Sequence, residues 1–185
     1  MEHSLPDNIP MPHSPVLGEN NDALVKKFTD TLTAIGGKVV PVKTVADIRY
    51  HLLTGIDIKG RNLTTVPLLG DLLEQVNRHN INSYALQNVD DVVIDAHFAV
   101  AENGALWVTD DKLMLRVLPF ICKHLSVIVN ASDIVATMYE AYSRIGNTNY
   151  DFGTFVAGPS KAADIEQSLV LGARGTGNIT VFLTV

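Results

Sequence analysis

The sequence is poor in cysteine, in charged residues and in clusters of basic residues. Cys122 is the only cysteine among 185 residues, which excludes an intramolecular disulfide and any four-cysteine zinc or iron–sulfur site built by one chain. Only 18% of the residues are charged, and the formal net charge is −6. We do not expect an acidic chain without a basic cluster to bind nucleic acid or an anionic membrane surface.

Long apolar runs are missing as well. No run approaches the roughly 20 residues that cross a bilayer, and the first residues lack the charged-then-apolar pattern of a secretory signal. The sequence therefore predicts a cytoplasmic protein with no membrane partner. Apolar residues make up 46% of the chain, a fraction typical of a compact globular domain.

The prolines are unevenly distributed. Four of the eight lie within residues 1–19, a composition typical of an extended or disordered arm. No internal repeat or second composition boundary follows. We therefore predict an arm over residues 1–19 and a single α/β domain over residues 20–185.

Helical periodicity alternates with short apolar runs along this domain. Helices are expected over residues 21–35, from a capping box of Thr44 and Asp47 onward, over 68–76, from a cap at Ser132 to Gly146, and over 161–171. Strands are expected over residues 39–42, 63–66, 84–86, 92–94, 125–129, 152–157 and 179–185. Several strands are continuously apolar, which predicts a mostly parallel sheet with helices on both faces.

An antiparallel hairpin is expected beside this sheet. Asn103 and Gly104 stand between two apolar runs that together cover residues 98–108. Asn-Gly at such a position predicts a type I′ turn, in which both residues have positive φ.

A Gly-Pro-Ser turn joins the strand over residues 152–157 to the next predicted helix. The free N–H groups of a helix start, the Ser160 hydroxyl and the Lys161 ammonium would all favour an anion there. The alternative is an ordinary N-cap, for which Ser160 alone is sufficient.

Three motifs in the second half of the chain resemble one family. They are Ala-Val-Ala-Glu-Asn-Gly-Ala-Leu at residues 99–106, Ala-Gly-Pro-Ser-Lys-Ala-Ala-Asp-Ile-Glu at 157–166, and Leu-Gly-Ala-Arg-Gly at 171–175. Together they resemble the lactate-utilization protein C family, the LUD domain. Its pattern is roughly Ala-Glu-Thr-Gly, then Gly-Pro-Ser-Arg-Thr-Ala-Asp-Ile-Glu, then Gly-x-His-Gly.

The resemblance implies a fold like that of ribose-5-phosphate isomerase and the CoA transferases. It also implies a role in the bacterial oxidation of L-lactate to pyruvate, with iron–sulfur clusters on partner proteins and no cofactor on this chain. The chain departs from the family pattern at Asn103, Ala162 and Arg174, where the family has threonine, threonine and histidine. An arginine stays charged at any working pH, so position 174 can bind an anion but cannot transfer a proton.

The predicted ligand-binding residues are Asn103, Gly104, Gly158, Pro159, Ser160, Lys161, Asp164, Gly172, Arg174 and Gly175. The Arg174 guanidinium could hold a carboxylate through two hydrogen bonds; the alternative is a surface arginine after a helix-ending glycine. Glu102 is the candidate catalytic residue, a nucleophile like the glutamate of CoA transferases. Its alternative is a polar residue that holds the hairpin turn.

Other reactive residues favour structural roles. Asp95 and His97 are two potential metal ligands without an evident third, so no metal site is predicted. Cys122 in an apolar stretch and Trp107 on the hairpin are expected to pack in the core.

These patterns leave three hypotheses for function. The leading one is a LUD-domain subunit of lactate utilization that binds a small carboxylate or phosphorylated ligand alongside iron–sulfur partner proteins. The first alternative is a stand-alone acyl or CoA transferase, or an ATP-dependent ligase, that uses Glu102. The second is a non-catalytic assembly subunit. Whether the chain is an enzyme stays open, and so does its oligomeric state, a homo-oligomer included.

Overall fold

The computed structural model describes residues 20–57, 59–76, 86, 88–146, 148–163, 169–171 and 176–185. The predicted arm over residues 1–19 lies outside this range, as does most of the predicted strand over 84–86. Within the described residues, no helix is long and apolar enough to cross a membrane.

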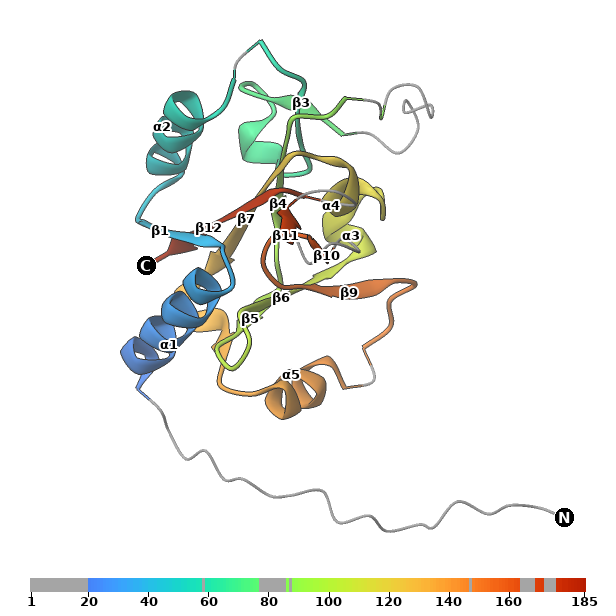
Figure 1. Cartoon of the computed structure of the whole chain (residues 1–185). Coiled ribbons are helices and arrows are strands. Elements are labelled where there is room, and N and C mark those ends of the chain that lie inside the picture. The colour runs from blue at the N-terminus through green and yellow to red at the C-terminus, as the bar shows by residue number, and fades with distance from the viewer. Residues whose placement is uncertain are drawn as a thin grey trace, which may run out of the picture.

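A parallel sheet of six strands forms the centre of the domain (Figure 1). In spatial order its strands are β1 (Lys38–Val42), β12 (Asn178–Thr184), β7 (His124–Asn130), β4 (Asp91–Asp95), β2 (Asn62–Thr64) and β3 (Glu74–Gln75). Every neighbouring pair is parallel. The strand that contains Pro41 lies at the sheet edge, where a missing backbone N–H is tolerated.

A second, mixed sheet lies against one face of the first. Its order is β8 (Ile134–Val135), β5 (Phe98–Val100), β6 (Ala105–Thr109) and β9 (Gly153–Val156). β5 and β6 pair antiparallel, so the predicted hairpin is confirmed. Its turn differs from the prediction: the loop has four residues, 101–104, and only Gly104 has positive φ. The Asn103 side chain instead accepts a hydrogen bond from Ala105 N at 3.1 Å.

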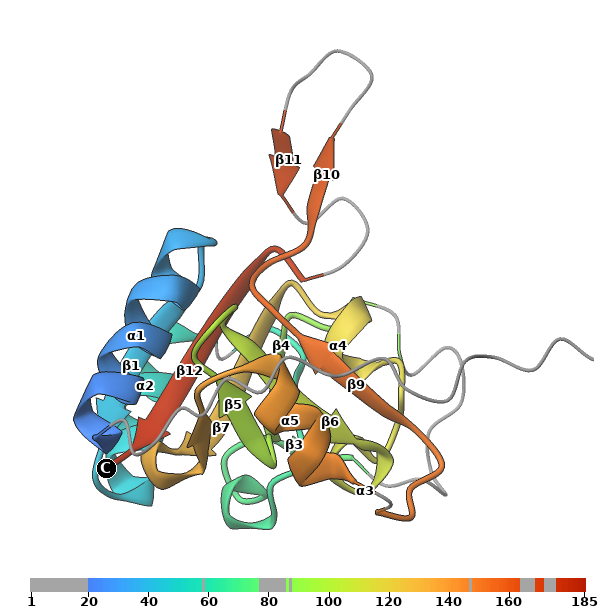
Figure 2. The same cartoon turned by 90° about the horizontal axis from the view of Figure 1, so that it is seen from below.

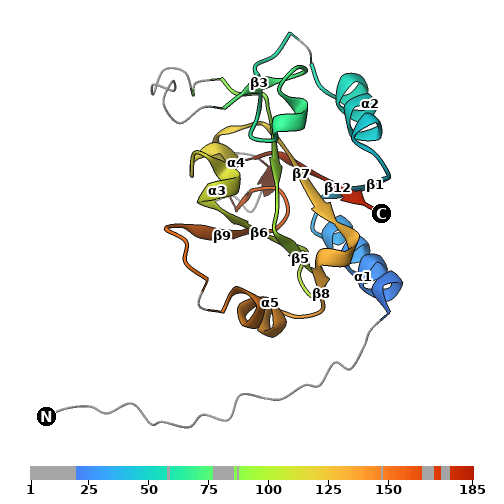
Figure 3. The ribbon, with the colours of Figure 1, turned by 180° about the vertical axis from the view of Figure 1, so that it is seen from behind.

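Helices pack against both sheets (Figure 3). The longer helices are α1 (Asn21–Ala34), α2 (Val45–Gly55) and α5 (Met138–Ile145); the short turns are η1 (Pro67–Leu69), α3 (Asp110–Leu113), α4 (Leu118–Ile121) and η3 (Ala131–Asp133). α2 packs on the parallel sheet through Ile48 and Leu52, and α1 packs between the two sheets through Phe28 and Leu32. α5 packs on the mixed sheet. The predicted α/β class, with helices on both faces of a parallel sheet, is confirmed.

One predicted helix is wrong, and another begins later than predicted. The segment over residues 68–76 contains the end of η1, a turn and β3 instead of a helix. The helix predicted from Ser132 begins only at Met138, with Thr137 as its N-cap, and ends at Gly146 as expected. The reason is a non-local pairing: Ile134 and Val135 join β5 as a parallel strand, and β-branched residues favour that environment.

The helix predicted over residues 161–171 is wrong in the described parts of that segment. Lys161–Ala163 form β10 and Leu169–Leu171 form β11, an antiparallel pair that stands out from the domain (Figure 2). The backbones at the two ends of the segment pair with each other, instead of forming the i to i−4 hydrogen bonds of a helix. Ser160 N donates to Thr176 O at 2.8 Å, so it is not the free N–H group of a helix start that the anion-site prediction assumed.

The predicted capping box at α2 is present. Asp47 N donates to Thr44 Oγ1 at 3.2 Å, and Thr44 N donates to Asp47 Oδ2 at 2.8 Å. We expect Thr44→Ala to lower the free energy of unfolding by about 1 kcal/mol in urea titrations. Thr54→Ala in the last turn of the same helix is the control, with an expected change under about 0.5 kcal/mol. Equal effects of the two substitutions would contradict the capping role.

Candidate functional site

The structure brings the first two family-like motifs together at the carboxyl end of α1. Ile35, the residue after this helix, lies between two turn glycines. A Cβ built on Gly104 would lie 3.4 Å from Ile35 Cδ1, and a Cβ built on Gly158 would lie 3.0 Å from the same atom. Their φ angles are +71° and +68°. Both positions therefore require glycine, for conformation and for close approach to Ile35.

Further contacts join these turns to α1 and to the loop that follows it. Thr31 Oγ1 donates to Ala101 O at 3.1 Å. A Cβ on Gly36 would lie 3.3 Å from the ring of Pro159, which is buried. The hairpin turn over residues 101–104 and the turn over 158–160 thus share one structural corner, which we call the motif corner.

Glu102 and Asn103 are exposed residues of the motif corner that form local hydrogen bonds. Glu102 Oε2 accepts from Met138 N at 2.7 Å, which places a carboxylate at the amino end of α5, where the helix dipole favours it. Asn103 accepts from the backbone of its own turn. These contacts fit the alternative in which Glu102 holds the turn. Its role as a nucleophile stays a prediction, and so do ligand contacts from Asn103 and Gly104.

The remaining predicted site residues are only partly described. Gly158, Pro159 and Ser160 form the described part of the second motif. The backbone of Lys161 opens β10. The other predicted residues lie outside the described residues; they are Asp164, Gly172, Arg174 and Gly175.

Thr176 connects the motif corner to Cys122. Its carbonyl oxygen accepts from Ser160 N, and its hydroxyl lies 3.0 Å from Cys122 O and 2.9 Å from Cys122 Sγ. The cysteine is 2% exposed. Burial raises the pKa of its thiol to about 11, so the group stays protonated at neutral pH. Cys122 is a packing residue, as predicted, and not a reactive thiol.

His97 belongs to a hydrogen-bonded cluster at the open end of the hairpin, away from its turn. Its Nε2 lies 2.5 Å from Thr109 Oγ1 and 3.4 Å from Asp111 Oδ1. Both partners share one ring nitrogen, whereas a catalytic relay uses both nitrogens. In the described part of the chain, no three His, Cys, Asp or Glu side chains are grouped so that they could hold a metal.

Asp95 gives this region a pH-dependent contribution to stability. Burial raises the pKa of its carboxyl group, and the opposing charges of Lys112 and His97 only partly offset this. If the pKa of a carboxyl group is higher in the folded than in the unfolded state, the free energy of unfolding falls as pH rises above the unfolded-state pKa. We therefore expect Asp95→Asn to unfold at higher urea than the wild type at pH 7, with a difference that vanishes below about pH 4.

Asp111→Asn is the control of opposite sign. Its hydrogen bond from Thr109 and the charge of His97 outweigh desolvation, and the pKa of Asp111 is lowered. This variant should unfold at lower urea at pH 7, and its difference should also vanish in acid. The same sign for both variants would contradict the burial of Asp95.

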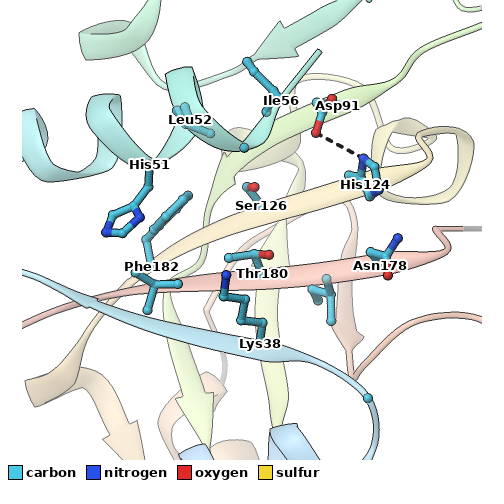
Figure 4. A pocket seen from close by; sticks show the side chains of 14 residues that line it. Lys38, His51, Leu52, Ile56, Asp91, His124, Ser126, Asn178, Thr180 and Phe182 are labelled. Atoms are coloured by element: carbon cyan, nitrogen blue, oxygen red, sulfur yellow. Dashed lines mark ion pairs between the residues drawn. The ribbon is translucent and has the colours of Figure 1, made fainter.

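Sequence reasoning missed a group of polar side chains that meet at the amino ends of the parallel strands (Figure 4). Asp91 Oδ1 lies 3.4 Å from His124 Nδ1, and Ser126 faces the same cavity. The available signal was the presence of Ser126 and Thr180 inside otherwise apolar strands.

Comparison with known proteins places this geometry in a family. The family model described as LUD domain matches residues 71–184, more than half of the chain. This chain belongs to the LUD domain family. The matched range includes both turns of the motif corner and four of the six strands of the parallel sheet, namely β3, β4, β7 and β12.

A solved structure shares the fold of this LUD domain. It is a DUF162 family protein from Deinococcus radiodurans, 15% identical, with a TM-score of 0.66 over 91% of this chain and 100% of that one. At this identity the likeness shows the fold alone. A comparison with curated proteins finds no match.

Proposed function

We propose that this LUD domain protein is a subunit of bacterial lactate utilization, acting in the oxidation of L-lactate to pyruvate with iron–sulfur partner proteins. Family membership supports a lactate-utilization-like protein in general. The observation that supports the proposal most is the packing of two family motifs around Ile35. One buried cysteine cannot hold an iron–sulfur cluster, so the redox centres would belong to the partners.

The proposed ligand of the motif corner is a small carboxylate or phosphorylated molecule. Gly158 would hold the turn over residues 158–160 against Ile35, and Lys161 and Arg174 would supply positive charge. Glu102 would hold the turn against α5 through its bond to Met138 N. In this proposal the carboxylate positions the site and does not react.

Co-purification tests the subunit role. A tagged chain isolated from its host during growth on L-lactate is expected to bring down cysteine-rich iron–sulfur proteins, and a tagged chain from cells grown without lactate serves as the comparison. Recovery of the chain alone under both conditions would overturn the subunit role.

Glu102→Gln separates this proposal from the transferase alternative. A glutamine keeps an oxygen that can accept from Met138 N but cannot form the acyl intermediate of a transferase. The subunit proposal expects unchanged lactate-dependent growth of the host. Loss of that growth with an intact fold would favour the transferase.

A further inference from the structure

A cavity of about 300 Å³ lies between α2 and the amino ends of the parallel strands (Figure 4). Its polar lining residues are Lys38, His51, Asp91, His124, Ser126, Asn178 and Thr180. They come from α2 and from four adjacent strands, β1, β12, β7 and β4. A site of this kind cannot be found in any one segment of the sequence.

Strand register aligns these side chains in two rows across the sheet. Asp91, His124 and Asn178 are paired across β4, β7 and β12. Two residues further along, Ser126, Thr180 and Lys38 are paired across β7, β12 and β1. Residues two apart on a strand face the same side, so both rows face the cavity.

The next row on the same face is apolar. Val40 and Phe182 pair in register and pack with Ile48 and Leu52 of α2. This face of the sheet therefore changes from an apolar core to a polar cavity beneath the last turn of α2. Two of the polar lining residues, Asp91 and Ser126, are buried, which is informative because burial of polar groups is unfavourable unless they find partners.

Several of these groups have no partner of their own. Among the described residues, no carboxylate pairs with Lys38 Nζ, which extends towards Thr180 (Figure 4). No hydrogen bond within the described part of the chain involves the Ser126 or Thr180 hydroxyl, although Ser126 is only 7% exposed. These donors are available to a ligand in the cavity.

The opposite end of the cavity is rich in acceptors. Asp91, 4% exposed, faces His124 Nδ1 and leaves Nε2 as the ring nitrogen available to a ligand. The carboxyl end of α2 at Gly55 and Ile56 lines the same region, where helix carbonyl groups lack helical partners. The nearby Asp90 is neutralised by Lys123, with Nζ and Oδ1 2.6 Å apart.

We propose that this cavity binds a small polyhydroxylated anion, with its carboxylate or phosphate group at Lys38, Ser126 and Thr180 and its hydroxyl groups at Asp91 and His124. Lys38 and Asp91 lie on strands three positions apart in the sheet, a separation of about 14 Å between their backbones. A ligand longer than a single anionic group is needed to contact both ends. The cavity volume is at the lower end of the range for small-molecule sites.

The cavity adjoins the motif corner. Gly36 lines it, and a Cβ on Gly36 would also lie 3.3 Å from Pro159 of the Gly-Pro-Ser turn. The assignment is independent of the lactate role, because it depends only on the groups inside the cavity.

Isothermal titration of the full chain with four probes tests the proposal: gluconate, glucose 6-phosphate, glucose and inorganic phosphate. We expect gluconate or glucose 6-phosphate to bind at millimolar or lower concentration, and whichever binds more tightly identifies the anionic group. Lys38→Met should weaken that binding about tenfold or more, because a charged hydrogen bond is lost. Lys43→Met, at the opposite end of the sheet, should leave it unchanged.

Two outcomes would overturn the proposal. One is the absence of binding by both anionic sugars; the other is equal binding by neutral glucose or by the Lys38→Met variant. Lys38 is exposed at the rim of the cavity, so its substitution should leave the fold intact, and a wild-type far-ultraviolet circular dichroism spectrum is the check. None of these outcomes bears on lactate-dependent growth.

Discussion

Leu32→Ala is expected to lower the free energy of unfolding by about 2–5 kcal/mol, the largest effect among our stability predictions. Leu32 is fully buried and belongs to the core between the two sheets. A Cβ on Gly37 would lie only 2.7 Å from Leu32 Cγ, so the surroundings already fit the side chain closely. Truncation of Leu32 to alanine would leave a cavity that the neighbouring strands of the two sheets cannot fill.

Leu53→Ala on α2 is the matched control. Leu53 is also helical but 48% exposed, and its truncation should change the free energy of unfolding by less than about 0.5 kcal/mol. Urea titration of both variants is the measurement. A change below 1 kcal/mol for Leu32→Ala would mean that α1 does not pack between the sheets.

Gly104→Ala is expected to lower the free energy of unfolding by about 2–3 kcal/mol. The φ of +71° disfavours any side chain by about 1–2 kcal/mol. The new Cβ would also lie 3.2 Å from Leu32 Cα, a backbone atom that cannot rotate away. Overpacking of this kind adds about 1 kcal/mol or more.

Gly55→Ala provides the control for this substitution. Gly55 ends α2 without positive φ, and a Cβ there meets nothing within 4 Å. Because alanine favours a helix, the variant should be unchanged or up to about 1 kcal/mol more stable. If both alanine variants unfolded at the wild-type urea concentration, the hairpin turn would not lie against α1 as described.

Local signals predicted much of the fold. Thr44 and Asp47 marked the start of α2, because a capping box is made within four residues. Mostly apolar runs marked β4 and β7, because both strands are largely covered on both faces. Asn103 and Gly104 marked the hairpin, although the loop has four residues.

Non-local pairing explains most of what was missed. Ile134 and Val135 join β5, so a segment expected to be helical became a strand. No local pattern contains the partner strand of such a segment, and propensity alone cannot choose between the two structures. The error at residues 161–171 is different, because β10 and β11 pair with each other within that segment.

The candidate site was likewise predictable where its residues are contiguous in sequence, and not where they meet only in the fold. The motifs at residues 99–106 and 157–166 are contiguous, so resemblance could find them. Their meeting point could not be found, because in the sequence Ile35 is only one more apolar residue, directly after α1. The row formed by Asp91, His124 and Asn178 depends on the register of three strands that are far apart in sequence.

Growth on L-lactate tests the central proposal most directly. A host strain that lacks this chain should grow on glucose but not on L-lactate, and the wild-type chain should restore growth. The Ser160→Ala, Arg174→Ala double variant should fail to restore it while accumulating to wild-type levels, because the proposed ligand contacts of the motif corner are removed. Unimpaired growth of the deletion strain on L-lactate would contradict the proposed function, and full rescue by the double variant would contradict the proposed site.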